Sequence, residues 1–403
     1  MSDSILAVIE TLNENKTAPV CAYIYDLDGI QAHVIQMRQM LPKQTFLFYA
    51  IKANPDQRII KALLPYIHGF EVASLGELLN VRAVSEKVSI LFGGPGKTDA
   101  ELEMAIRHNV SYIHVESLLE LQRIQMLAQK LNKKVDILLR INLRTNALPA
   151  TQITMGGVPS PFGFDESAIQ QAVAIVRQDS HQLVQIKGFH FHSLSNNVQA
   201  ALHVEMVRLY VKKALEWKHL YNLDLQVLNA GGGFGVSYNE APSFDWQQFT
   251  SLLQASDIWQ SLKGVQLFFE PGRFLVADYG YYATEILDIK QSHQQYFAIV
   301  RGGTHHNRLP ASWGHNQPFQ LYASETWSYA IERPSFQNIK VNLVGELCTP
   351  KDRLHSDANV STIRVGDIVI FKKSGAYCWT ISHHDFLGHP HPAFYYIEGG
   401  QVR

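Results

Sequence analysis

A regular alternation of short apolar runs with helical patterns constrains this fold more than any other feature of the sequence. Eight runs have the length and composition of buried strands, at 45–51, 69–72, 88–91, 111–115, 135–141, 185–191, 226–230 and 265–269. Between them apolar residues recur at helical spacing, as from Leu202 through Val207 to Trp217. Eight strands alternating with helices over about 250 residues predict a closed parallel (β/α)8 TIM barrel in an α/β protein.

The sequence changes character after about residue 283. Runs at 296–300, 340–347, 367–373 and 394–398 alternate or are β-branched, and turn residues separate them. They predict an antiparallel β domain, a sandwich or small barrel, which the early run 20–26 is expected to join. A helix with Ile30, Val34, Met37 and Leu41 on one face would lead into the barrel. We therefore predict a barrel domain over 27–283 and a β domain over 1–26 plus 284–403.

Charge and cysteine content narrow the range of partners. The 403 residues carry a formal net charge of -1, too little to gather nucleic acid or an anionic membrane, so a small-molecule substrate is expected. Cys21, Cys348 and Cys378 are too widely spaced for a disulfide framework or a zinc motif. The first residues lack the basic start of a signal peptide, and no apolar stretch is long enough to span a membrane. These features favour a soluble, unprocessed cytoplasmic protein.

Polar residues follow the predicted barrel strands at the carboxyl ends, where barrel active sites lie. They are Lys52, Glu71, Gly94, Lys97, His114, Glu116, Arg140, His190, His192, Gly231 to Gly233, Glu270 and Arg273. Lys52 stands among apolar and small residues in FYAIKANP, where partial desolvation would lower the pKa of its amine and suit it to condense with an aldehyde. A lysine extending from the barrel rim into water is the alternative.

Two further segments have the chemistry of a phosphate and heteroaromatic site. In LNAGGGFG, glycines after a strand would let backbone N–H groups face a phosphate, although a tight turn has the same sequence. In FFEPGRF, Glu270 could keep a pyridine nitrogen protonated and Arg273 could pair with a phosphate, unless the two form a structural salt bridge.

The segment GFHFHSLSNN places His190 and His192 on one face of a strand, with Ser195 just beyond. An imidazole there could stack on a flat ring, and the hydroxyl could bond its phosphate. Core histidines or a metal pair are the alternatives, of which metal is the weakest because the remaining ligands of a zinc motif are missing nearby. We predict no metal, including at the His383, His384, Asp385, His389 and His391 cluster, whose prolines make its spacing irregular.

Seven segments in this order and spacing resemble the alanine-racemase-fold (fold-type III) pyridoxal-phosphate decarboxylases that act on diaminopimelate, ornithine or arginine. They are FYAIKAN, FEVASLGEL, FHFHSLSNN, LNAGGGFG, FEPGR, GELCTPKD and SGAYCWTISHH, and they cover nearly the whole chain. Within the family, FGGPGKTD, HVESLLELQR and ISHHDFLGHPHP are most similar to the siderophore branch, which serves staphyloferrin B biosynthesis.

The resemblance implies roles for individual residues. Lys52 would bond pyridoxal 5'-phosphate, His192 would stack on its ring and Glu270 would face the pyridine nitrogen. Its phosphate would be bound by a set of loop residues, Ser195, Gly231, Gly232, Gly233, Gly235, Arg273 and Tyr377. Catalytic residues would be Lys52, His192 and Cys348, with Cys348 supplied by the partner subunit of a homodimer whose active sites are shared.

Two departures from the family pattern bear on the substrate. Thr349 follows Cys348, where related decarboxylases carry an acidic residue that meets a distal ammonium, and Ser160-Pro161-Phe162-Gly163 replaces Ser-Lys-Phe-Gly. Groups suited to citrate carboxylates are available instead at Arg301, His305, His306, Arg308, Lys351, His383 and His384. We expect Arg308, Thr349 and His383 to contact the substrate, unless these loop charges are merely solvated.

The predicted reaction is therefore decarboxylation of citryl-diaminopropionate to citryl-ethylenediamine. A diaminopimelate- or ornithine-type decarboxylase is the first alternative. An amino-acid racemase is less favoured, because the racemases use a tyrosine from the partner chain where this sequence has Cys348 in LCTPKD. A non-catalytic pyridoxal-phosphate carrier lacks the β domain that this chain has.

Overall fold

The computed structural model describes residues 1–144 and 159–403. By their packing these residues form two compact units, one of 33–236 and 242–274, the other of 1–32, 237–241 and 275–403. None of the helices in this described part of the chain combines the length and apolar character that a membrane crossing needs. The domain boundaries predicted above remain a proposal beside this division by packing.

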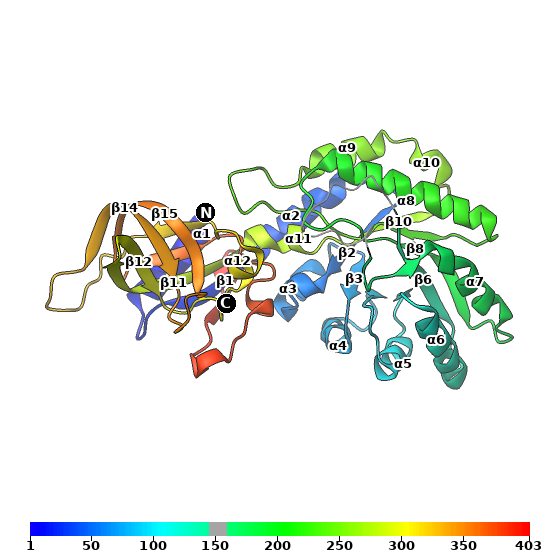
Figure 1. Cartoon of the computed structure of the whole chain (residues 1–403), viewed down its shortest axis with the longest axis horizontal. Coiled ribbons are helices and arrows are strands. Elements are labelled where there is room, and N and C mark those ends of the chain that lie inside the picture. The colour runs from blue at the N-terminus through cyan, green and yellow to red at the C-terminus, as the bar shows by residue number, and fades with distance from the viewer. Residues whose placement is uncertain (145–158) are drawn as a thin grey trace. The chain divides into compact units, whose positions relative to one another are not determined.

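The first unit is a closed barrel of eight parallel strands with helices on its outside (Figure 1). Around the barrel the strands follow the order β5-β4-β3-β2-β10-β9-β8-β6, and β5 pairs with β6 to close it. All eight coincide with the predicted runs: β2 (Thr45–Ala50), β3 (Gly69–Val72), β4 (Ser89–Phe92), β5 (Tyr112–Val115), β6 (Val135–Asn142), β8 (Val184–His190), β9 (Val227–Asn229) and β10 (Gln266–Phe269). A two-residue strand, β7 (Phe164–Asp165), extends β6. The predicted barrel is confirmed.

Side-chain caps fix the residue at which three of the barrel helices begin. The side chains of Ser74, Thr98 and Ser117 accept a hydrogen bond from the N–H three residues on, at the start of α4 (Leu75–Val84), α5 (Asp99–Arg107) and α6 (Leu118–Leu131). These caps hold short strand-to-helix loops at the carboxyl ends of the strands. The other barrel helices are α2 (Leu27–Met40), α3 (Gln57–Leu63), α7 (Ile169–Gln178), α8 (Ala200–Leu220), α9 (Trp246–Gln254) and α10 (Ile258–Ser261).

Large apolar side chains fill the barrel interior. Phe48, Leu91, Leu138, Val227 and Phe268, each from a different strand, form one buried cluster. Because this interior is packed rather than hollow, the polar residues at the strand ends are confined to the barrel mouth.

The second unit is a mixed β domain with strand order β15-β14-β12-β11-β1-β17-β18, and β16 pairs with both β11 and β13. Its strands are β1 (Cys21–Asp26), β11 (Gly280–Ser292), β12 (Gln295–Val300), β13 (Phe319–Tyr322), β14 (Ser335–Val344), β15 (Arg353–Arg364), β16 (Ile368–Phe371), β17 (Ala393–Glu398) and β18 (Gln401–Val402). The early strand joins the sheet, as predicted.

The purely antiparallel prediction needs one correction. β1 runs parallel to β17 and β12 runs parallel to β14. Strands so far apart in the chain can pair in either direction, because no tight turn connects them. Helix α1 (Asp3–Glu14) packs Ile5, Val8 and Ile9 into the core of this domain, which also holds two short helices, α11 (Arg273–Val276) at its entry and α12 (Leu309–Trp313).

Candidate active site

Lys52 lies at the carboxyl end of a barrel strand, in the turn η1 (Ile51–Ala53) that follows β2. Its Nζ is 3.4 Å from Oε2 of Glu71 on β3, and its side chain is 43% exposed, whereas that of Glu71 is 6% exposed. Burial raises the pKa of Glu71, and the charge of Lys52 opposes that shift. The amine is thus oriented by a buried carboxylate and still open to the barrel mouth.

Glu270 directly follows β10 and is 5% exposed. Its Oε1 accepts a hydrogen bond of 2.6 Å from Nδ2 of Asn229, and its Oε2 lies 3.3 Å from Nε2 of His190. The same Asn229 accepts from the N–H of Gly231 through Oδ1 at 2.9 Å. Asn229 therefore couples the position of the carboxylate to the start of the glycine loop.

Two buried histidines pack beside that carboxylate. The rings of His114 and His190 stack with centroids 4.0 Å apart and an interplanar angle of 20°. Burial holds the pKa of each well below its usual value, and the neighbouring imidazole lowers that of His114 further. Both rings are therefore neutral near pH 7 and do not neutralise a carboxylate next to them.

Among the described residues, His114, His190 and Glu270 also form the one group of three side chains with ligating atoms close enough for a metal, all within 4.8 Å of one another. The hydrogen bond from Asn229 occupies Oε1 of Glu270. The His383–His391 cluster is arranged differently: the ring of His384 stacks on Trp379 and His389 lies 3.5 Å from Glu346.

The glycine loop follows β9 and packs against the loop after β8. The N–H of Gly232 donates to Nδ1 of His192 at 3.1 Å, and a Cβ at Gly232 would lie only 2.4 Å from the backbone oxygen of Glu270. A Cβ at Gly235 would lie 2.7 Å from the backbone of Asn196. Gly231 and Gly233 have φ of +71° and +95°, which side-chain-bearing residues rarely adopt. Only glycine lets these backbones approach so closely.

His192 and Ser195 belong to the loop that faces these glycines. Burial holds the pKa of His192 well below its usual value, and the charge of Lys52 lowers it further. Since Nδ1 accepts a hydrogen bond, the neutral ring carries its proton on Nε2. Ser195 is half-buried beside it. The predicted cofactor residues Lys52, His192, Ser195, Glu270 and the glycines thus all come from strand ends of one barrel mouth.

Of the three remaining predicted residues, Arg273 belongs to the barrel unit, whereas Tyr377 and Cys348 belong to the β domain. Arg273, 8% exposed, opens α11 directly after the last barrel strand. In the β domain, Tyr377 has φ of +57° and Cys348 is exposed in the loop between β14 and β15. The roles assigned to these three remain predictions.

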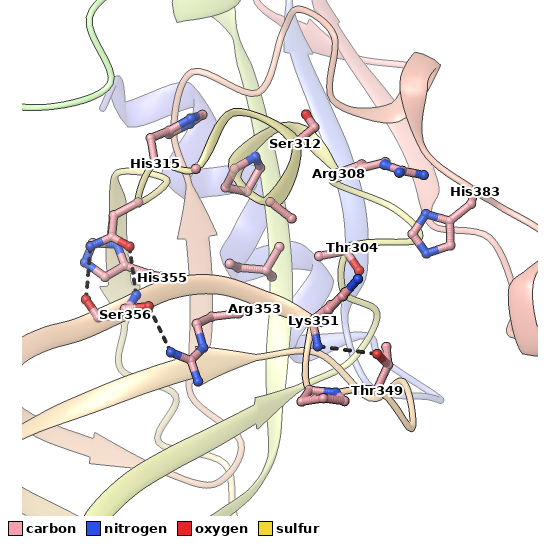
Figure 2. Close-up of a pocket in the computed structure, with 16 residues that line it drawn as sticks. Thr304, Arg308, Ser312, His315, Thr349, Lys351, Arg353, His355, Ser356 and His383 are labelled. Atoms are coloured by element: carbon pink, nitrogen blue, oxygen red, sulfur yellow. Dashed lines mark hydrogen bonds between the residues drawn. The ribbon is translucent and has the colours of Figure 1, made fainter.

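Arg308, Thr349 and His383, the three predicted substrate residues, line one pocket of about 740 Å³ in the β domain (Figure 2). Arg308 precedes α12, Thr349 belongs to the loop after Cys348, and His383 lies near the end of the chain. Lys351 lines the same pocket. The fold therefore brings together Arg308 and His383, which are 75 positions apart in the sequence.

The other four cationic candidates do not line this pocket. Arg301 forms an ion pair with Glu346. His305 and His306 are fully buried, and burial lowers their pKa values to about 4 and about 2. His384 stacks on Trp379. These four side chains thus already have contacts within the β domain, and their predicted availability to a substrate remains a prediction.

Two charged residues predicted at strand ends are structural. Nζ of Lys97 is buried and donates to Glu120 at 2.5 Å and to the backbone oxygens of Gly94 and His114. Arg140 pairs with Glu116 at 2.8 Å and lies over the ring of Phe162, so it helps hold the Ser160–Gly163 loop. These groups brace the barrel mouth.

The sequence argument missed Asn229, which precedes the glycines in LNAGGG. Its position was the available signal, since a polar amide at the end of a buried strand needs partners. It also missed Arg353, His315 and His355, which line the pocket together with Arg308. Arg353 and His355 lie two residues apart on β15, and His315 comes next to them because the segment after α12 is tied to that strand by two hydrogen bonds between Asn316 and Ser356.

Comparison with known proteins matches residues 27–277 to the family model described as pyridoxal-dependent decarboxylase, pyridoxal binding domain. The chain is 43% identical over 393 residues to the 2-[(L-alanin-3-ylcarbamoyl)methyl]-2-hydroxybutanedioate decarboxylase of Staphylococcus aureus, covering 97% of each protein. It is 34% identical to the L-glutamyl-[BtrI acyl-carrier protein] decarboxylase of Niallia circulans, covering 92% of this chain and 87% of that one.

Among solved structures, diaminopimelate decarboxylase from Helicobacter pylori complexed with L-lysine superimposes with a TM-score of 0.86 at 25% identity. The match covers 98% of this chain and 95% of that one. The lysine/ornithine decarboxylase from Vibrio vulnificus has the same fold, with a TM-score of 0.80 at 21% identity over 99% of both chains.

Proposed function

The chain belongs to the pyridoxal-dependent decarboxylases, and from that membership we propose that it decarboxylates a 2,3-diaminopropionate whose side-chain amine is joined to citrate. The product would be citryl-ethylenediamine, a building block for a siderophore. The enzyme is a pyridoxal-phosphate-dependent carboxy-lyase with the alanine-racemase-like fold.

One observation in the chain carries this choice of substrate: the residue after Cys348 is Thr349, a neutral side chain. A carboxylate at this position would suit a substrate with a free distal ammonium. A substrate whose distal amine is joined to citrate in an amide has no such ammonium. The two relatives named above act, by their names, on a citrate amide of an alanine-3-yl group and on a glutamyl group attached to a carrier protein. Both names describe an amino acid that is joined to a second group.

The barrel mouth fits the cofactor. Gly231, Gly232, Gly233 and Gly235 leave a cradle that a single Cβ would fill, next to the buried Glu270 carboxylate and the Lys52 amine. Pyridoxal phosphate, when bound, supplies an electron sink for the charge left by the departing carboxylate. Lys52, His192, Ser195, Gly231, Gly232, Gly233, Gly235, Glu270, Arg273 and Tyr377 are the residues that we propose to hold it.

The chain's own groups then divide the work. Glu270, held by Asn229, would keep a proton on the pyridine nitrogen, which strengthens the sink. Lys52 would bind the cofactor through its amine, and His192 would help to hold the cofactor ring. Cys348 would return a proton to the α-carbon, in a homodimer in which each chain completes the other's site. We propose a cytoplasmic location.

Mass spectrometry of reaction mixtures tests the proposal. Purified protein loaded with pyridoxal phosphate is incubated separately with citryl-diaminopropionate and with diaminopimelate, and carbon dioxide loss is followed. We expect loss from the citryl compound alone, and a decrease in rate of at least about a thousandfold in Lys52→Ala. Loss from diaminopimelate alone would favour the diaminopimelate-type enzyme, and α-proton exchange without mass loss would favour a racemase.

A further inference from the structure

The β-domain pocket has the size of a small-molecule site. Its volume of about 740 Å³ lies within the roughly 300–1,000 Å³ that such sites span. Figure 2 shows Thr304, Arg308, Lys351 and His383 on one side and His315, Arg353, His355 and Ser356 on the other. Every one of these residues belongs to the β domain, so the pocket is formed without the barrel.

The lining is one-sided in charge. It contains Arg308, Lys351 and Arg353 as well as three histidines, and no aspartate or glutamate. No carboxylate of residues 1–144 or 159–403 forms an ion pair with any of these three cations, and their interactions are with neutral groups such as Oγ of Ser356, 3.4 Å from Nη1 of Arg353. Uncompensated cations around a concave surface attract anions and bind carboxylates directly.

The pocket walls are tied together in advance. Asp352 is 2% exposed and accepts from the N–H of Thr304 at 2.6 Å and from that of Leu347 at 2.9 Å, which joins the wall before α12 to the loop that carries Lys351. On the far side Asn316 and Ser356 exchange two hydrogen bonds through Oδ1 and Nδ2 of Asn316, at 2.9 and 3.0 Å. The carboxylate of Asp352, next to Lys351 in the chain, is thus already hydrogen-bonded to backbone N–H groups.

His383 adds a second indication of a ligand. Its Nδ1 is buried and has no hydrogen-bond partner among the described residues. A buried ring nitrogen without a partner is costly unless water or a ligand satisfies it. This nitrogen belongs to the wall that also carries Arg308.

We propose that this pocket binds the hydroxy-polycarboxylate half of the substrate, so that Arg308, Lys351 and Arg353 select citrate conjugates by their two free carboxylates. This inference rests on the proposed function. It adds that recognition of the distal half lies in the β domain, in the segment that directly follows Cys348. Thr349 and Lys351 line the pocket one and three residues after that cysteine, so the distal half is held close in sequence to the reacting thiol.

Citrate itself is the probe for the binding step. Titration calorimetry on the full chain loaded with pyridoxal phosphate compares the wild type with Arg308→Gln, Lys351→Gln and the double variant. Each single substitution is expected to raise the Kd for citrate at least tenfold, and the double variant more. Lys340→Gln, which removes an exposed cation of β14 outside the pocket, is expected to leave the Kd unchanged. Equal affinity in the wild type and the double variant, or no binding to any of them, overturns the inference.

Kinetics separate failure of this inference from failure of the proposed function. With citryl-diaminopropionate, Arg308→Gln and Lys351→Gln should raise KM at least tenfold and leave kcat within threefold. If the wild type turns over that substrate and the variants have its KM, the pocket is not the subsite and the proposed function stands. If no decarboxylation occurs but citrate binding is lost in the double variant, the proposed function fails and the anion pocket stands.

Discussion

At the scale of single residues, the barrel uses histidine as a neutral, well-packed side chain. His203 on α8 is 2% exposed, its ring stacks on Phe234 with centroids 4.2 Å apart, and Phe244 and Phe249 meet it edge-on. Burial lowers its pKa to about 3 from 6.5. The folded protein therefore excludes a proton that the unfolded chain takes up.

The lowered pKa of His203 determines the direction in which the free energy of unfolding changes with pH. Above pH 6.5 neither state protonates His203, and as pH falls from 6.5 toward about 3 only the unfolded state does, so stability is lost across that window. We expect His203→Phe to reduce the slope of unfolding free energy against pH by up to about 1.4 kcal/mol per pH unit. Urea denaturation at about pH 7.5 and about pH 5 measures it, with His219→Phe on the exposed end of the same helix as control. An unchanged slope contradicts the assignment.

Glu270 is the residue on which the proposed electron sink depends. Glu270→Gln keeps the shape and removes the charge, so we expect kcat to fall by about 10²–10³ with a smaller change in KM. The pair Asn229–Glu270 offers a graded comparison, because Asn229→Ala removes the 2.6 Å hydrogen bond and leaves the carboxylate. That variant should lose less activity than Glu270→Gln. If the Glu270→Gln enzyme had the wild-type kcat, the proposed action of this carboxylate on the pyridine nitrogen would be wrong.

At the scale of elements, the loop after β9 is shaped by its lack of side chains. Gly232→Ala would force a Cβ to within 2.4 Å of the Glu270 backbone oxygen, so the loop must move. We expect at least about tenfold weaker binding of pyridoxal phosphate, and a loss of about 1–3 kcal/mol in the free energy of unfolding of the cofactor-free protein. Gly96→Ala is the matched control, because a Cβ there meets no atom within 4 Å. Fluorescence titration measures how tightly each variant binds the cofactor. If both variants bound it as tightly as the wild type, this account would be wrong.

The strands differ in whether the sequence alone predicts them. All eight barrel strands were predictable because each is an apolar run in a strictly local pattern. β15 was not, because RLHSDANVSTIR is mostly polar, only four of its twelve residues are buried, and its strand character comes from pairing with β14. The site divides in the same way: Lys52, His192 and Glu270 lie at strand ends that the sequence reveals, whereas Arg353 and His355 share a pocket with Arg308 only because the segment around α12 lies beside β15.

At the scale of the whole molecule, the proposal assigns Lys52 and Cys348 of one active site to two different chains. Lys52 belongs to the barrel and Cys348 is exposed in the β domain. If Cys348 of one chain serves Lys52 of the other, a mixture of Lys52→Ala and Cys348→Ala chains contains heterodimers with one intact site.

Mixing therefore gives a direct measure of shared sites. Each variant alone is expected to be strongly impaired, and the exchanged mixture should recover about a quarter of wild-type sites, since half of the dimers are mixed and each has one intact site of two. The control is a mixture of Lys52→Ala with wild type, which should retain activity without gain. A Lys52→Ala and Cys348→Ala mixture no more active than the sum of its parts would mean that each chain builds its own site.

The position of β1 has a consequence for how the protein is made. Ala22 pairs with Ala283 of β11 and with Ala393 of β17, so β1 is synthesised well before either of its two partner strands. The barrel strands, all encoded between these partners, can close while translation continues. A nascent chain thus carries an unpaired edge of β1 until β17 has been synthesised, and termination before residue 393 would leave a folded barrel attached to an incomplete sheet.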